Sequence, residues 1–175
     1  MEPGTRVFDT EDDDPDPAIV VRAPDDKTIA DWTYEKDGEE VSTADENPNY
    51  PEDAQLVNVT FEEYLKQRWP EWTDAAPATL WTKVQDREIP VYGFPESRLG
   101  YVEPPATLES AIAQLAESVD AVEWRPAEQH LHIETLGETF TIAPDGTVSG
   151  EGRYADRLEE IVADPTDEST YKYQP

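Results

Sequence analysis

The sequence has no cysteine, one methionine and two histidines among its 175 residues. Without cysteine it can form no disulfides, no thiolate metal sites and no cysteine nucleophile. No apolar run approaches the roughly 18 residues that a membrane-spanning helix needs. The first residues, MEPGTRVF, also lack the charged and then apolar pattern of a secretory signal. These absences predict a soluble, cytoplasmic protein that makes no contact with a membrane.

Basic residues are also scarce. Lys and Arg number 13 against 41 Asp and Glu, which gives a formal net charge of −28. Only five lysines occur against 23 glutamates. In molar salt the Debye length falls to about 3 Å, so neighbouring carboxylates hardly repel each other. Hydrated carboxylates also aid solubility more than lysines do. The composition therefore predicts a halophilic protein, with a DNA mimic or a binder of strongly basic partners as the alternatives.

The most acidic stretch is the run of five carboxylates between Glu11 and Asp16. A calcium-binding EF-hand loop would need a D-x-[DN]-x-[DN]-G pattern with Glu at its twelfth position. No glycine follows this run, and the chain turns apolar at Ala18. We interpret the run as a solvated loop that serves salt adaptation.

Residues 1–101 read as short strands separated by acidic turns, with two helices inserted. Asp37-Gly38 is a strong signal for a hairpin turn. Thr60 and Glu63 have the spacing of a capping box at the start of the first helix, and a second helix is expected over residues 76–87. We predict an α+β protein in which this module is a small curved sheet or an SH3-like barrel with a helical insertion.

The sequence predicts a second module over residues 102–163, and the two prolines at 104 and 105 mark the joint between the modules. A stripe of Leu108, Ile112, Leu115 and Val119 indicates a helix, with Thr107 as its expected cap. Three strands and a final helix over residues 153–163 complete an α-β-β-β-α unit with both helices on one face. Residues 164–175 have little to bury, and we expect a flexible tail there.

Three segments of the first module carry a resemblance: EPGTRVFDTEDDDPDPAIVV, NPNYPED and IPVYGFPESRL. Together they resemble short acidic proteins found in haloarchaeal genomes, over roughly residues 2–99. The resemblance implies a haloarchaeal origin. It carries no function and no catalytic residues to this chain.

The middle of the chain, residues 61–101, is nearly neutral and rich in aromatic residues. It holds 8 of the 17 aromatic residues and 5 of the 13 basic ones. Part of this set fits a hydrophobic core. Trp69 and Trp72 flank Pro70 at a helix end, however, and Lys66 and Arg68 lie beside them. Tryptophan next to arginine is typical of protein-interface hot spots and of single-strand stacking platforms.

The two histidines fall in one segment, HLHIE. On a strand, His130, His132 and Glu134 share one face, and two imidazoles with a carboxylate could hold zinc or another divalent ion. The other interpretation is that Leu131 and Ile133 face the core and the histidines face solvent.

No catalytic motif is present: the sequence has no G-x-S-x-G, P-loop, G-x-G-x-x-G or H-E-x-x-H pattern. The sequence therefore predicts a non-catalytic interaction or regulatory protein without a cofactor. It is expected to dock a protein partner through Trp69, Trp72, Arg68 and Lys66. A nucleic-acid-binding regulator is the alternative, although molar salt weakens phosphate binding. A metal-dependent enzyme that uses His130, His132 and Glu134 is the third hypothesis.

Overall fold

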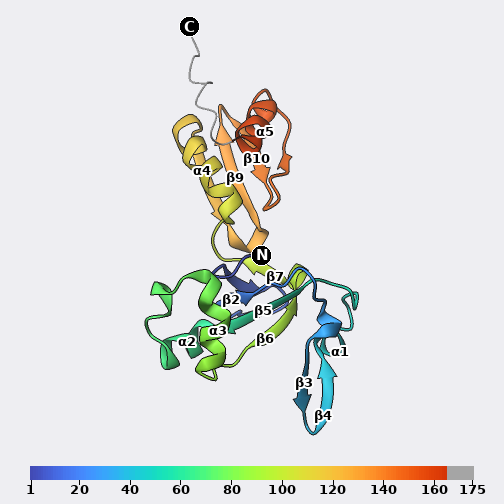
Figure 1. Ribbon diagram of the computed structural model, residues 1–175. Helices are drawn as coiled ribbons and strands as arrows, with labels where there is room; N and C mark the ends of the chain where they lie inside the picture. Colours follow the sequence, from blue (N-terminus) through green and yellow to red (C-terminus); the bar gives the residue numbers. More distant parts are fainter. Residues whose placement is uncertain (165–175) are drawn as a thin grey trace. The chain divides into compact units, whose positions relative to one another are not determined.

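The computed structural model describes residues 1–164 of the chain (Figure 1). The described chain is α+β, as predicted, and its sheets are antiparallel and open. It divides after Val102 into two units, Met1–Val102 and Glu103–Pro175. The predicted flexible tail lies outside the described residues except for Asp164, which follows the last helix.

The first unit is built on a five-stranded antiparallel sheet with the strand order β6-β5-β2-β1-β7. Its strands are β1 (Arg6–Asp9), β2 (Ala18–Arg22), β5 (Leu56–Phe61), β6 (Tyr92–Pro95) and β7 (Leu99–Tyr101). Within the described residues no pairing joins the two edge strands, β6 and β7. The sheet is therefore open, and the SH3-like barrel that the sequence left as one alternative does not close.

The predicted helical insertion lies between β5 and β6. It consists of α2 (Glu62–Arg68), two 3-10 turns (Trp72–Asp74 and Pro77–Thr79) and α3 (Leu80–Asp86). Leu65 of α2 and Leu80 and Val84 of α3 pack with Ile19 and Val21 of β2. Because successive side chains of a strand point to opposite faces, one face of the sheet is buried under these helices.

The other face of the sheet buries a second cluster. Val7, Val20, Val57, Val59 and Leu99 form its centre. The β2 run AIVV is therefore apolar on both faces, and all four of its side chains are buried. This explains why β2 shows no alternation of apolar and polar residues in the sequence.

A hairpin with a short helix projects from this unit (Figure 1). It comprises the 3-10 turn η1 (Ile29–Asp31), β3 (Thr33–Lys36), β4 (Glu39–Ser42) and α1 (Thr43–Glu46). Asp37 and Gly38 both have positive φ, at 54° and 84°. This is the geometry of the predicted tight hairpin turn. Ser42 and Asp45 form a capping box that fixes the start of α1.

The second unit is a four-stranded antiparallel sheet in the order β11-β10-β9-β8. Its elements are α4 (Ala106–Ser118), β8 (Ala121–Arg125), β9 (His130–Thr135), β10 (Glu138–Ile142), β11 (Val148–Ser149) and α5 (Ala155–Ala163). One core joins Leu115 of α4, Leu158 of α5, and Leu131 and Phe140 of the sheet. Both helices therefore cover the same face, and α4 begins after Pro105 rather than at a Thr107 cap.

Thr60 departs from its predicted role. It was expected to cap α2, but it lies in strand β5 and is fully buried, and Phe61 takes the N-cap position. The strand runs one residue further than the capping signal suggests because Ala18 pairs with Phe61 and Ile19 with Thr60. The Thr60 hydroxyl is buried without a hydrogen-bond partner among the described residues.

Substituting Thr60→Val should raise the free energy of unfolding by about 1 kcal/mol, since valine keeps the shape and removes an unsatisfied buried hydroxyl. Urea unfolding in molar KCl, followed by circular dichroism, measures the change. Thr33→Val, at an exposed position of β3, is the matched control and should shift stability by less than about 0.5 kcal/mol. A destabilised Thr60→Val variant would contradict the expectation.

Candidate functional site

The predicted docking residues around Pro70 separate in the structure. Trp69 is 6% exposed and belongs to the core between α2, α3 and β2. Trp72 is half-buried against the same cluster. Lys66 and Arg68 are exposed on α2. The expectation that both indoles are surface groups is therefore corrected for Trp69, because α2 turns this ring inward over the sheet.

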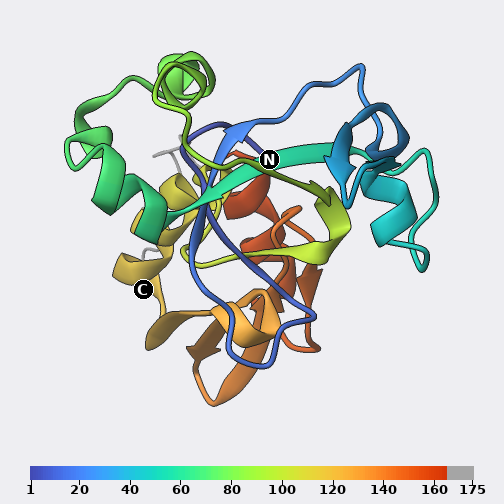
Figure 2. The same cartoon turned by 90° about the horizontal axis from the view of Figure 1, so that it is seen from below.

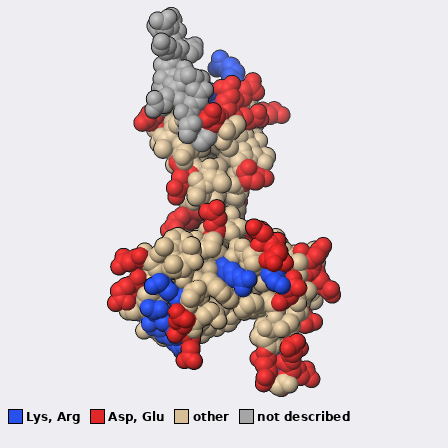
Figure 3. Space-filling view, in the orientation of Figure 1, with Lys and Arg blue, Asp and Glu red and all other residues tan. Residues whose placement is uncertain are grey.

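Two basic side chains lie over the ring of the buried Trp69. The guanidinium of Arg87 lies 4.6 Å from the ring centre of Trp69, and the ammonium of Lys83 lies 5.5 Å from it. Figure 3 shows Lys and Arg gathered over α2 and α3, whereas carboxylates cover the β3–β4 hairpin. Two of the five cations of the middle stretch, Lys83 and Arg87, are thus held by cation–π contact with a core ring.

Three other aromatic rings do form a surface, which we call the aromatic surface: Phe61, Tyr64 and Tyr92. The rings of Tyr64 and Tyr92 stack with centroids 6.4 Å apart, and Phe61 meets Tyr92 edge to face at 5.2 Å. Tyr92 is 39% exposed and is one of two exposed large hydrophobic side chains among the described residues. The other is Leu136, at the β9–β10 turn of the second unit.

The two tyrosine hydroxyls of this surface are 3.4 Å apart. The hydrogen bond with Tyr64, together with partial burial, raises the pKa of Tyr92 to about 12. The phenol of Tyr92 is therefore a neutral donor and acceptor at physiological pH. A hollow of about 480 Å³ lies beside Tyr64 and is lined by Phe61, Tyr64 and Lys66 among others.

The wall of this hollow contains a buried carboxylate, Glu62, which is 6% exposed. Burial raises its pKa, but hydrogen bonds from Lys66 and Arg6 outweigh the burial, so the pKa of Glu62 lies below its usual value. The ammonium of Lys66, one of the predicted docking groups, is thus held at 2.7 Å from a carboxylate of its own helix.

A larger groove of about 830 Å³ runs along the edge strand β6. Every residue from Val91 to Phe94 lines it. Its other walls come from the hairpin side, through Trp32, Tyr34, Lys36, Glu46 and Asn47, and from Asp9 and Arg98. Tyr92 belongs to both the groove and the aromatic surface, so the two features are continuous.

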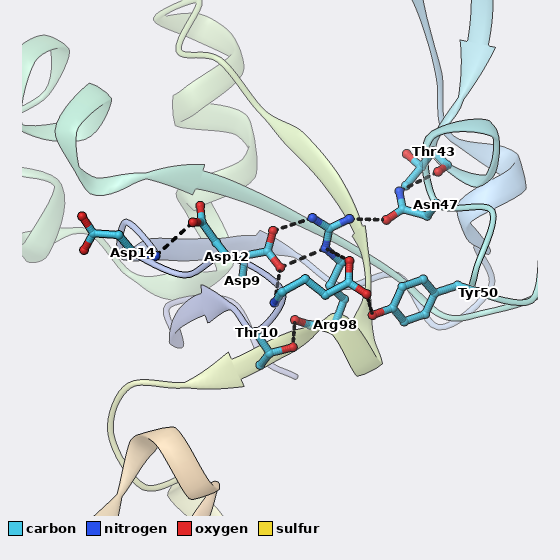
Figure 4. Close-up of polar contacts among 9 residues, drawn as sticks. Asp9, Thr10, Asp12, Asp14, Thr43, Asn47, Tyr50 and Arg98 are labelled. Atoms are coloured by element: carbon cyan, nitrogen blue, oxygen red, sulfur yellow. Dashed lines mark hydrogen bonds and ion pairs between the residues drawn. The ribbon is translucent and has the colours of Figure 1, made fainter.

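Arg98 is the structural centre of this groove (Figure 4). Its Nε donates to Asp9 Oδ1 at 2.9 Å and its Nη2 to Asp9 Oδ2 at 2.6 Å, while Nη1 donates to Asn47 Oδ1 at 2.8 Å. Its guanidinium also lies 5.4 Å from the ring centre of Phe94. Arg98 therefore ties β1, the α1 segment and β6 together.

The network extends outward from Arg98. Asn47 is buried and donates to the carbonyl of Thr43 at 2.7 Å, and Tyr50 donates to Glu11 at 2.9 Å. Burial raises the pKa of Asp9, but the hydrogen bonds from Arg98 and from the Glu11 backbone outweigh it, so this pKa lies below the usual value. The Asp9–Arg98 pair consequently stays charged at neutral pH.

Gly93 allows the hairpin to approach β6 closely. A Cβ atom at this position would lie 2.5 Å from the hydroxyl oxygen of Thr43 and 2.9 Å from Cδ1 of Trp32. The indole of Trp32 in turn meets Trp81 of α3 edge to face at 5.8 Å. Only glycine fits between the strand and this wall of the groove.

The predicted loop at Glu11 to Asp16 follows β1 without regular structure. Local hydrogen bonds from backbone to side chain stabilise its turns: Glu11 N–H donates to the Asp9 carboxylate, and Asp14 N–H donates to the Asp12 carboxylate. Within residues 1–164, no group of three or more acidic or histidine side chains is arranged to hold a metal ion.

The histidine segment lies on β9 of the second unit, where Leu131 and Ile133 are buried in the core. His130, His132 and Glu134 share the opposite face. Each imidazole has its own carboxylate, however: His130 Nε2 lies 3.2 Å from Glu128, and His132 Nε2 lies 3.3 Å from Glu134. The described geometry thus gives two separate pairs on one strand face and no three-ligand cluster.

Comparison with known proteins finds no matching family model, no matching curated protein and no matching solved structure. Among the described residues, none of the helices has both the length and the apolar character needed to cross a membrane.

Sequence reasoning missed Trp32, Tyr34 and Arg98 as site residues. The partners of Arg98 lie 89 and 51 residues away in sequence, at Asp9 and Asn47. No local spacing could have paired them. Tyr64 and Tyr92 belong to the aromatic residues of the middle stretch. Their spacing in the sequence does not distinguish them from the aromatic residues that form the core.

Removing the central guanidinium should weaken the first unit. We expect Arg98→Ala to lower the free energy of unfolding by about 3 kcal/mol, because Asp9 and Asn47 lose their partner in a mostly buried place. Urea unfolding in molar KCl measures this change. Arg68→Ala, at an exposed position of α2, should cost less than about 0.5 kcal/mol. An unchanged midpoint for Arg98→Ala would show that the network contributes nothing net.

Proposed function

We propose that the chain is a non-catalytic interaction or regulatory protein of a halophile, and that it docks a protein partner through the aromatic surface of Phe61, Tyr64 and Tyr92. The observation that carries the proposal is the exposed ring of Tyr92, stacked on the half-buried ring of Tyr64, in a chain whose surface is otherwise dominated by carboxylates. Tyrosine is among the residues most enriched at interface hot spots.

The solvent supports this choice of surface. Molar salt reduces the Debye length to about 3 Å. Charges on two proteins therefore attract each other only at very short distance. Burial of apolar area does not depend on charge. An aromatic surface is therefore a suitable docking device for a protein that works in concentrated salt.

The neighbouring hollow adds shape and polarity to the surface. Lys66, Glu62 and Tyr64 line its wall, and the hydroxyl of Tyr64 lies 3.4 Å from that of Tyr92. Lys66 is thus the one residue of the sequence-predicted docking set that lines a concave part of this surface. Trp69 supports α2 from below rather than meeting a partner.

The test is capture of a partner from a native high-salt lysate with the tagged full chain. We expect Tyr64→Ser with Tyr92→Ser to lose at least nine-tenths of the captured protein while its circular dichroism spectrum in high salt stays unchanged. Leu136→Asn removes the other exposed large hydrophobic side chain and should capture as the wild type does. Mass spectrometry identifies and quantifies the captured protein.

Undiminished capture by the double tyrosine variant would overturn this surface. Captured material that disappears after nuclease treatment would instead favour a nucleic-acid-binding regulator. Should the double variant unfold, Tyr92→Ser alone repeats the comparison at the more exposed ring.

Salt adaptation is tested separately by dilution of KCl from molar concentration to about 0.1 M, where the Debye length grows to about 10 Å. We expect loss of the folded circular dichroism signal, because carboxylates on both units then repel each other. Replacing KCl by NaCl at equal ionic strength should preserve the fold. A chain that stays folded at 0.1 M would show that its acidity serves another purpose.

A further inference from the structure

The outer edge of β6 carries backbone groups that no described strand uses. Strand β6 ends the sheet, with β5 as its only partner strand among the described residues. Strand edges of this kind are templates for pairing with another chain. Here the edge lies inside the groove, because Val91, Tyr92, Gly93 and Phe94 all line it.

The direction of each backbone group follows from the register. Glu96 N–H donates to the Gln55 carbonyl at 2.9 Å, so the backbone of Gln55 faces β6. Backbone groups alternate in direction along a strand, and Val57 and Val59 therefore face β6 as well. They pair with Phe94 and Tyr92. The N–H and carbonyl of Gly93, which lies between these two, point away from β5 and into the groove.

Aromatic side chains flank this edge on both faces of the sheet. Tyr92 and Phe94 lie on the face of Val57 and Val59, since directly paired residues share a face. Trp32 lies on the face to which Gly93 would point a side chain. A segment laid along β6 would thus find apolar contact for its alternate side chains above and below the strand.

The charge of the groove selects the kind of segment. Its two cations, Lys36 and Arg98, form ion pairs with Glu46 and Asp9. Two further carboxylates lie next to these pairs. Glu11 lies 3.4 Å from Arg98, and Glu39 pairs across the hairpin with Lys36 and so shares its face. The groove lining itself is balanced, with Asp9 and Glu46 against Lys36 and Arg98, so Glu11 and Glu39 beside it make the surroundings of the groove negative.

We propose that the groove binds an extended, basic segment of the partner protein, which adds as a strand to the open edge of β6. The inference rests on the proposed function and names the chemistry of its partner. Hydrogen bonds to Gly93 give the segment its register, the flanking rings take its apolar side chains, and lysine or arginine side chains meet Glu39 and Glu11. A second copy of this chain would bring like charges together at the same edge.

The probe is a synthetic peptide of alternating lysine and valine, eight residues long, added to the isotope-labelled full chain in KCl at the lowest concentration that keeps the fold. NMR follows each backbone amide. At saturation we expect the exchange of the Gly93 amide proton with solvent to slow at least tenfold. A peptide with alternate backbone nitrogens methylated cannot pair as a strand on that side, and it should bind at least tenfold more weakly.

Two matched variants test the charge. Glu39→Lys lies on the groove face of the hairpin and should weaken binding of the basic peptide at least threefold. Glu35→Lys lies on the same hairpin but on its opposite face, since β3 alternates, and it should bind as the wild type does. A glutamate–valine peptide should bind more weakly than the lysine–valine peptide to the wild-type chain.

Several results would overturn the proposal: unchanged exchange at Gly93 with peptide bound elsewhere, equal affinity for the methylated peptide, or equal effects of the two hairpin variants. Concentration-dependent self-association in sedimentation, with Gly93 protected, would make a second copy the occupant instead. If the peptide fails while Tyr64→Ser with Tyr92→Ser still abolishes partner capture, strand addition falls and the proposed function stands.

Discussion

The bond between Arg98 and Asp9 is the constraint on which the first unit depends. It joins residues 89 positions apart, and the same guanidinium binds Asn47 and packs on Phe94. The guanidinium is a planar group with fixed donor directions. It joins the edge strand β6, the α1 segment and β1. A lysine could not hold three elements in this way. Arg98 thus joins groove walls that come from three separate parts of the chain.

The local features of the fold could be predicted from the sequence. Apolar runs, the Asp37-Gly38 turn and the helical stripe from Leu108 to Val119 each act within a few residues, and each corresponds to an observed element. The start of α2 could not be predicted in this way. Thr60 has the spacing of a cap, but its strand pairing with Ile19 outweighs this local signal, because long-range ladder bonds hold it in β5.

The candidate site could be predicted only in part, for the same reason. The sequence indicated the aromatic middle stretch and not which of its rings face solvent. Whether Trp69 or Tyr92 is exposed depends on how α2 and the edge strand pack against β2 and β5, which are remote in sequence. Likewise, the carboxylates beside Arg98 are two among 41 acids, and only the tertiary contacts single them out.

The pairing of β1 with β7 has a consequence for synthesis. During N-to-C-terminal synthesis, Arg6–Asp9 emerges long before Leu99–Tyr101, its partner on one side. Until that partner arrives, β1 offers an unpaired edge to other nascent chains. Five carboxylates, from Glu11 to Asp16, follow this strand closely in the sequence. Charged residues next to a strand oppose aggregation. An acidic run in this position has the character of a gatekeeper segment.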